Sequence, residues 1–110
     1  MLAKKPEIIL FTNTTNTQMI REICAGIEEE GLLYRCVERV ETDAVHMAVE
    51  ASKEATIGVG IGVAGERAVL THESLKQEKP LFVLEDGDRE KARSLGKNAA
   101  RFIKKMPLSV

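Results

Sequence analysis

Residues 55–63 form the most continuously apolar stretch of this chain, and they constrain its fold more than any other segment. A short run of this kind, bounded by polar and turn-forming residues, is typical of a strand that is buried on both faces. Such a strand needs partners on each side of the sheet. We therefore expect residues 55–63 to be the central strand of a sheet that helices cover on both faces.

Short apolar runs alternate with helical patterns along the rest of the chain. Strands are predicted at residues 7–11, 33–37 and 81–84, whereas residues 67–71 suit a returning strand or the start of a helix. One helix is predicted to end at Glu30, a second to span about residues 44–53 behind a Thr42 cap, and a third to end before Pro107. The core face of the last helix is expected to contain Ala92, Leu95, Ala99, Phe102, Ile103 and Met106. This alternation indicates an α/β fold with a mainly parallel sheet, and residues 1–110 are expected to form a single domain.

The composition argues against several classes of function. The chain has three Phe, one Tyr and no Trp, which is too few aromatic faces for a platform that stacks nucleic-acid bases. A net charge of −1 gives no overall attraction to nucleic acid or to an acidic membrane. Cys24 and Cys36 match neither a redox pair nor a zinc pattern, so two buried, reduced thiols are expected. The N-terminal residues contain neither a cleavage-site pattern nor a membrane-length apolar span.

Three consecutive acids, Glu28, Glu29 and Glu30, end the first predicted helix, with Gly31 as its left-handed stop. The carboxyl end of a helix carries partial negative charge and favours cations, so an acid cluster is misplaced there. A cluster in this position suggests that a positive charge arrives from outside, either as a metal ion or as a basic partner surface. The alternative interpretation is an ordinary solvated acidic face.

The last helix has the opposite character, with six bases and no acid from Lys91 onward. Cations near the carboxyl end of a helix are favoured by its dipole, so a solvated basic face is one interpretation. Phosphate binding and contact with an anionic protein partner are the others.

Gly60, Gly62 and Gly65 have the spacing of a dinucleotide-binding loop, and Glu85 lies at the expected distance beyond them. The loop normally opens a domain and leads into a helix, and neither condition is clearly met here. The glycines equally suit close helix packing and a tight turn. The two histidines, His46 and His72, lack a recognisable metal-ligand spacing, and no acid, base and nucleophile come together. We therefore expect no enzymatic activity from the chain alone.

Several short blocks, in order along most of the chain, carry a family resemblance. They are residues 26–31 (GIEEEG), 59–62 (VGIG), 80–82 (PLF), 96–101 (GKNAAR) and 106–107 (MP). Together they resemble the small subunit of the reactivating factor for adenosylcobalamin-dependent diol and glycerol dehydratases. The resemblance implies a three-layer α/β/α sandwich on a sheet of about five strands, one of them antiparallel. That topology favours a returning strand at residues 67–71.

The resemblance implies a binding role rather than catalysis. In this family, a large actin-like subunit hydrolyses ATP, and the factor releases damaged cobalamin from the inactivated dehydratase. The small subunit leaves the large one, which then docks on the medium subunit of the dehydratase. The expected location is the cytoplasm, free or inside a bacterial microcompartment, and self-association is expected when the chain is purified alone.

The resemblance also assigns residues. Glu29 matches the glutamate that reaches a divalent metal, Mg²⁺, held by the large subunit, and Mg²⁺ commonly takes only one or two carboxylates. Glu28, Glu30, Asn98 and Arg101 are expected at the interface with that subunit. Two alternatives stay open: a stand-alone nucleotide-binding domain that uses the glycine loop, and a fragment of a dehydratase medium subunit that contacts cobalamin directly.

Overall fold

A computed structural model describes residues 7–75 and 79–105 of the chain. These residues form five strands and three helices. In chain order the elements are β1 (Glu7–Asn13), α1 (Thr17–Glu29), β2 (Leu33–Glu38), α2 (Ala44–Glu54), β3 (Val59–Ala64), β4 (Arg67–His72), β5 (Phe82–Leu84) and α3 (Arg89–Lys105). Met106 and Pro107, which the sequence assigned to the end of the last helix, lie outside the described residues. Within the described part, no helix is both long enough and apolar enough to cross a membrane.

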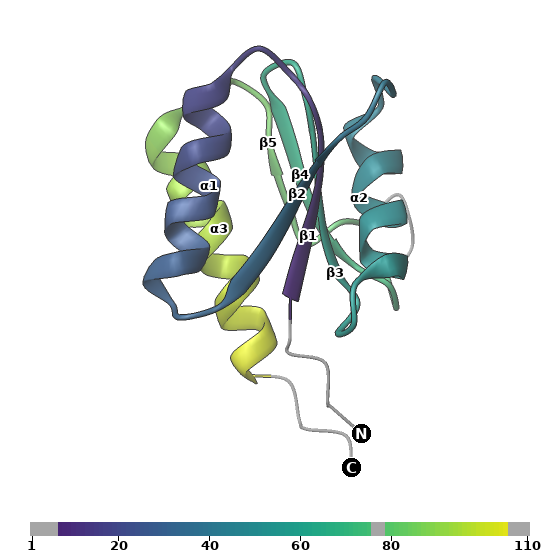
Figure 1. Cartoon of the computed structure of the whole chain (residues 1–110), viewed down its shortest axis with the longest axis vertical. Helices are drawn as coiled ribbons and strands as arrows, with labels where there is room; N and C mark the ends of the chain where they lie inside the picture. The colour runs from purple at the N-terminus through teal and green to yellow at the C-terminus, as the bar shows by residue number, and fades with distance from the viewer. Residues whose placement is uncertain (1–6, 76–78, 106–110) are drawn as a thin grey trace.

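The strands form one mixed sheet in the order β2-β1-β3-β4-β5. β1 is parallel to both β2 and β3, while β4 is antiparallel to its neighbours β3 and β5. Helices α1 and α3 cover one face of the sheet and α2 covers the other (Figure 1). The predicted three-layer α/β fold, with one antiparallel strand at residues 67–72, is therefore confirmed.

The central strand is β3, as the apolar run predicted, but it begins at Val59 and not at residue 55. Ala55 is the C-cap of α2, where its backbone N–H donates to Ala51 O. The chain then turns through Gly58, whose φ is +74°. Hydrophobicity alone missed this boundary, because buried residues at a helix end and in a strand look the same in sequence.

β1 is buried on both faces, so alternate side chains enter two separate hydrophobic layers. Ile8 and Leu10 join the larger layer beneath α1 and α3, which also includes Ile23. Ile9 and Phe11 pack instead with the α2 side. These two layers hold the helices in place, and the helices carry most side chains of the candidate sites.

Gly60 and Gly62 allow the backbone of α2 to lie directly on β3. A Cβ on Gly62 would collide with the carbonyl oxygen of Ala44 and lie 2.5 Å from the amide nitrogen of Ala48. Gly65 has φ +58° and forms the hairpin turn into β4. The glycines are therefore packing and turn residues, and the dinucleotide-loop interpretation is wrong, because a strand and not a helix follows them.

Two local expectations also need correction. The N-cap of α2 is Asp43 and not Thr42, because Asp43 Oδ1 accepts hydrogen bonds from the backbone of Val45 (3.0 Å) and His46 (3.2 Å). Both cysteines are free thiols, but only Cys24 is buried. Burial, the largest cause, raises its pKa to about 11. Cys36 is exposed, because it lies on the edge strand β2.

Replacing Gly62 with alanine should destabilise the fold by ~1–3 kcal/mol, because the added methyl must push α2 away from the sheet. Gly65→Asn is the matched control. A Cβ there meets nothing within 4 Å, and asparagine tolerates a positive φ. Urea unfolding of both variants measures the difference, and equal stabilities would contradict the packing role of Gly62.

Candidate functional site

The three consecutive acids lie at the carboxyl end of α1, as expected. Glu29 is the last helical residue, Glu30 is the C-cap, and Gly31 follows with φ +78°. The amide of Gly31 donates to the carbonyl oxygen of Glu28 at 2.9 Å. The predicted left-handed stop is confirmed, and it leaves the carboxylates at the end of the helix.

Helix α3 packs closely against α1 because both helices have a glycine at their contact. A Cβ on Gly26 would collide with the carbonyl oxygen of Arg93, and a Cβ on Gly96 would collide with that of Ile23. The two helices lie side by side on one face of the sheet (Figure 1). The close approach brings the acidic end of α1 against the basic face of α3.

Two carboxylates at the carboxyl end of α1 are each paired with two bases of α3. Glu29 pairs with Arg93 and with Lys97, whose Nζ lies 3.1 Å from Glu29 Oε2. Glu30 pairs with Lys104 at 3.1 Å and with Arg101 at 3.5 Å. We call Glu29, Glu30, Arg93, Lys97, Arg101 and Lys104 the helix-tip cluster.

The helix-tip cluster changes the interpretation of both charge runs. The sequence suggested that the cation opposite the acids comes from outside the chain, whereas α3 of the same chain supplies it. The basic face of α3 is likewise engaged within the chain, because Arg93, Lys97, Arg101 and Lys104 face the acids at the end of α1. Periodicity within each helix could not reveal this pairing, because it depends on how the helices pack.

The pairing lowers the pKa of both carboxyl groups. For Glu29 the main cause is the hydrogen bond from Lys97, and for Glu30 it is the hydrogen bond from Lys104. Both carboxylates are therefore ionised at neutral pH. The pairs of Glu29 are open to solvent, because its side chain is 42% exposed, and exposed ion pairs hold together only weakly.

The remaining residues assigned to the interface lie around this cluster. Glu28 is exposed and accepts a hydrogen bond from the hydroxyl of Tyr34 at 3.1 Å. Asn98 is exposed on α3, next to Lys97 in sequence. All five residues assigned to the interface are thus on α1 or α3, or at the end of α1. Arg93, Lys97 and Lys104 were not among them, and their spacing along one face of the last helix is the signal that could have found them.

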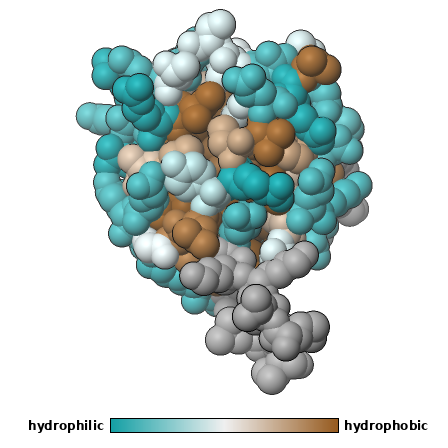
Figure 2. Space-filling model, viewed as in Figure 1, coloured by the Kyte–Doolittle hydropathy of each residue, from teal (hydrophilic) through white to brown (hydrophobic). Residues whose placement is uncertain are grey.

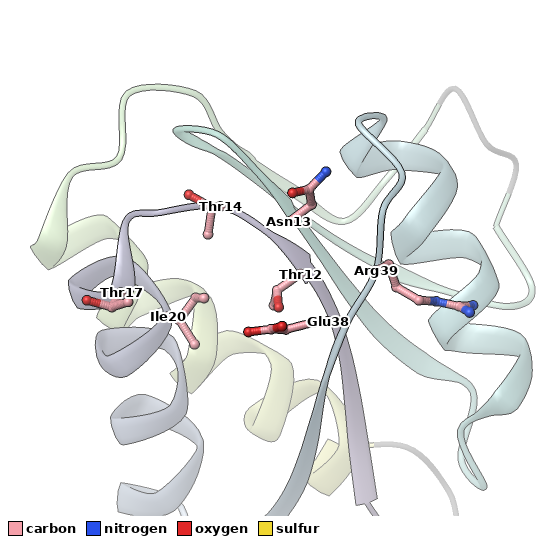
Figure 3. A pocket seen from close by; sticks show the side chains of 7 residues that line it. All are labelled: Thr12, Asn13, Thr14, Thr17, Ile20, Glu38 and Arg39. Atoms are coloured by element: carbon pink, nitrogen blue, oxygen red, sulfur yellow. The ribbon is translucent and has the colours of Figure 1, made fainter.

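A separate hollow lies at the carboxyl ends of β1 and β2 (Figure 3). Its volume is about 210 Å³, and its lining residues are Thr12, Asn13, Thr14, Thr17, Ile20, Glu38 and Arg39. In Figure 3 the side chain of Arg39 points away from the others, toward α2. The hollow is smaller than the ~300–1,000 Å³ typical of small-molecule sites.

Comparison with known proteins identifies a family. The family described as dehydratase medium subunit matches residues 5–109. The propanediol dehydratase-reactivating factor small subunit of Citrobacter freundii is 36% identical over 103 residues, covering 93% of this chain and 89% of that protein.

Two solved structures have the same fold over nearly their whole length. A glycerol dehydratase reactivase superposes with a TM-score of 0.85 at 30% identity, covering 96% of this chain and 97% of its own. A diol dehydratase-reactivating factor complexed with ADP and Mg²⁺ gives a TM-score of 0.82 at 28% identity, covering 98% and 100%.

Replacing Lys97 with glutamine should raise the pKa of Glu29 toward its ordinary value of 4.5, because Lys97 is the main cause of its lowering. A lowered pKa in the folded state means that the pair stabilises the fold above the ordinary pKa. This contribution is lost as the pH falls through the folded-state value. Carboxyl-carbon NMR titration of Glu29 measures the shift. Arg101→Gln, which removes a partner of Glu30 only, should leave Glu29 unchanged, and identical titrations in wild type and Lys97→Gln would contradict the pairing.

Proposed function

The chain belongs to the dehydratase medium subunit family and, within it, to the small subunits of diol and glycerol dehydratase-reactivating factors; from this membership we propose that it works by binding and releasing a large ATPase subunit. The family resemblance deduced from the sequence is thereby confirmed. The similar proteins are named as small subunits of the reactivating factor, which favours this role over that of a cobalamin-contacting dehydratase subunit.

The observation that carries the proposal is the exposed, weakly held carboxylate of Glu29 at the end of α1. A solved relative contains ADP and Mg²⁺, and Mg²⁺ accepts a single carboxylate among its oxygen ligands. In our proposal the large subunit holds the metal beside its nucleotide, and Glu29 reaches across the interface to it. Glu29 then exchanges Lys97 and Arg93 for the metal ion.

The helix-tip cluster keeps the free-energy cost of this exchange small. When Glu29 moves to the metal, Arg93 keeps a partner, because its Nε also donates to Glu22 Oε1 at 2.8 Å. Lys97 is solvated and can face acidic groups of the large subunit. The exposed residues Glu28 and Asn98 complete a polar contact surface together with Glu30 and Arg101. A polar surface of this kind suits an interface that must form and separate repeatedly.

The proposed cycle is a subunit exchange. This chain leaves the large subunit, and the large subunit then docks on the medium subunit of an inactivated dehydratase, whose family this chain shares. That docking opens the site and releases damaged cobalamin. ATP hydrolysis takes place on the large subunit, so this chain has no catalytic residues of its own and controls when the large subunit is free.

Glu29→Ala and Glu29→Gln should weaken binding to the large subunit about tenfold or more in the presence of ADP and Mg²⁺, because a charged partner is removed from the interface. Isothermal titration calorimetry with the co-expressed and separated subunits measures this. Glu54→Gln is the matched control, because Glu54 ends α2 on the opposite face of the sheet. Omitting Mg²⁺ should reduce the difference between wild type and Glu29→Gln.

Equal affinities of wild type and both Glu29 variants for the large subunit, with and without Mg²⁺, would show that Glu29 does not bind the metal. Failure of the wild-type chain to bind the large subunit under any nucleotide would reject the exchange mechanism itself. Circular dichroism of each variant verifies that the fold is retained.

A further inference from the structure

We propose that Glu41, His46 and Glu50 bind a divalent transition-metal ion of the zinc class. Each of the three side chains offers one ligand atom, and these atoms all lie within 4.8 Å of one another. The group combines one imidazole with two carboxylates, which is a different donor set from the acids of α1. We call these three residues the α2 triad.

The local structure places the α2 triad without any other chain. His46 and Glu50 are four residues apart on α2, so their side chains lie on one face, one turn from each other. Glu41 lies in the segment that leads into this helix, and its carbonyl oxygen accepts a hydrogen bond from Asn13 Nδ2 at 2.7 Å. The Asp43 cap fixes the start of the helix between Glu41 and His46. The three donors therefore converge because of features within the chain.

The chemistry of the donors selects the ion. Imidazole suits zinc, cobalt and nickel, whereas Mg²⁺ prefers oxygen ligands alone. His46 Nδ1 lies 2.6 Å from Glu41 Oε2, a hydrogen bond that must carry a proton. A metal ion can replace that proton and bind both groups after a small movement, with Glu50 as the third ligand. Zinc commonly takes three protein ligands and a water molecule in this way.

The surroundings leave the triad accessible. The side chains of His46, Glu50 and Glu41 are 48%, 40% and 29% exposed, so an ion reaches them from solvent and they can adjust to it. Arg39 forms a long ion pair with Glu50, with its Nη2 3.8 Å from Glu50 Oε1, too long for a direct hydrogen bond. Its guanidinium also lies over the ring of Phe11, 3.9 Å from the ring centre. Arg39 therefore holds Glu50 only loosely, and a metal ion competes with it for this carboxylate.

The α2 triad is independent of the proposed contact with the large subunit. His46 and Glu50 lie on α2 and Glu41 lies just before it, whereas Glu29 lies on α1 across the sheet (Figure 1). A negative result for zinc binding by the α2 triad therefore leaves the proposed role of Glu29 untouched, and the reverse also holds.

Titration of the chain with Zn²⁺ tests the inference, in a Cys36→Ser background that removes the exposed thiol. Calorimetry should detect one saturable site per chain, and His46→Ala should weaken it at least tenfold. Glu50→Gln should also weaken it. His72→Ala is the matched control, because His72 lies on β4 beside Ser74 and should leave zinc binding unchanged. Zn²⁺ should also raise the unfolding temperature of the parent but not of His46→Ala.

The proposal fails if the parent shows no saturable Zn²⁺ binding, or if the parent and His46→Ala bind Zn²⁺ equally. It also fails if binding is lost in His72→Ala and kept in His46→Ala. An equal response to Mg²⁺ would reject the transition-metal class. His46→Ala should keep its helix content, because alanine is a good helix former at an exposed position, and circular dichroism verifies this.

Discussion

The close approach of backbones at four glycines is the constraint on which the rest of this structure depends. Gly60 and Gly62 let α2 rest directly on the central strand, and Gly26 and Gly96 let α1 and α3 touch. At each glycine the neighbouring backbone occupies the space that a side chain would fill, so the helices lie closer to their neighbours than larger residues would allow. The ion pairs between α1 and α3 follow from this packing, because it brings the carboxyl end of α1 within reach of the bases of α3. The surface chemistry of one face thus follows from packing beneath it.

Much of the fold could be predicted from sequence. The apolar run before Val63 identified the central strand, and alternating patterns gave the class and the helix order. Boundaries were less accurate, because Ala55 looks like a strand residue although it ends a helix, and Thr42 looks like a cap although Asp43 makes the hydrogen bonds. The pattern alone left open whether residues 67–71 form a returning strand or begin a helix, because two β-branched residues do not exclude a helix. The family resemblance favoured the returning strand.

The candidate sites were harder to predict, for a physical reason. The acids at Glu29 and Glu30 and the bases of the last helix were both visible, but nothing in either segment shows that they meet. Contacts between helices depend on the tertiary arrangement, and the small residues that permit them are common in any sequence. His46 was set aside for want of a familiar metal-ligand spacing, although Glu50 follows it by one helical turn. Its third partner, Glu41, becomes a neighbour only once the chain enters α2.

The excess of positive charge in the helix-tip cluster has a consequence for how a partner arrives. Its four bases outnumber its two acids, so the cluster keeps a net charge of +2 although each acid is paired. Such a surplus acts over about a Debye length, ~8 Å at physiological salt. An acidic surface is therefore drawn toward this face during encounter, and its association rate falls as ionic strength rises.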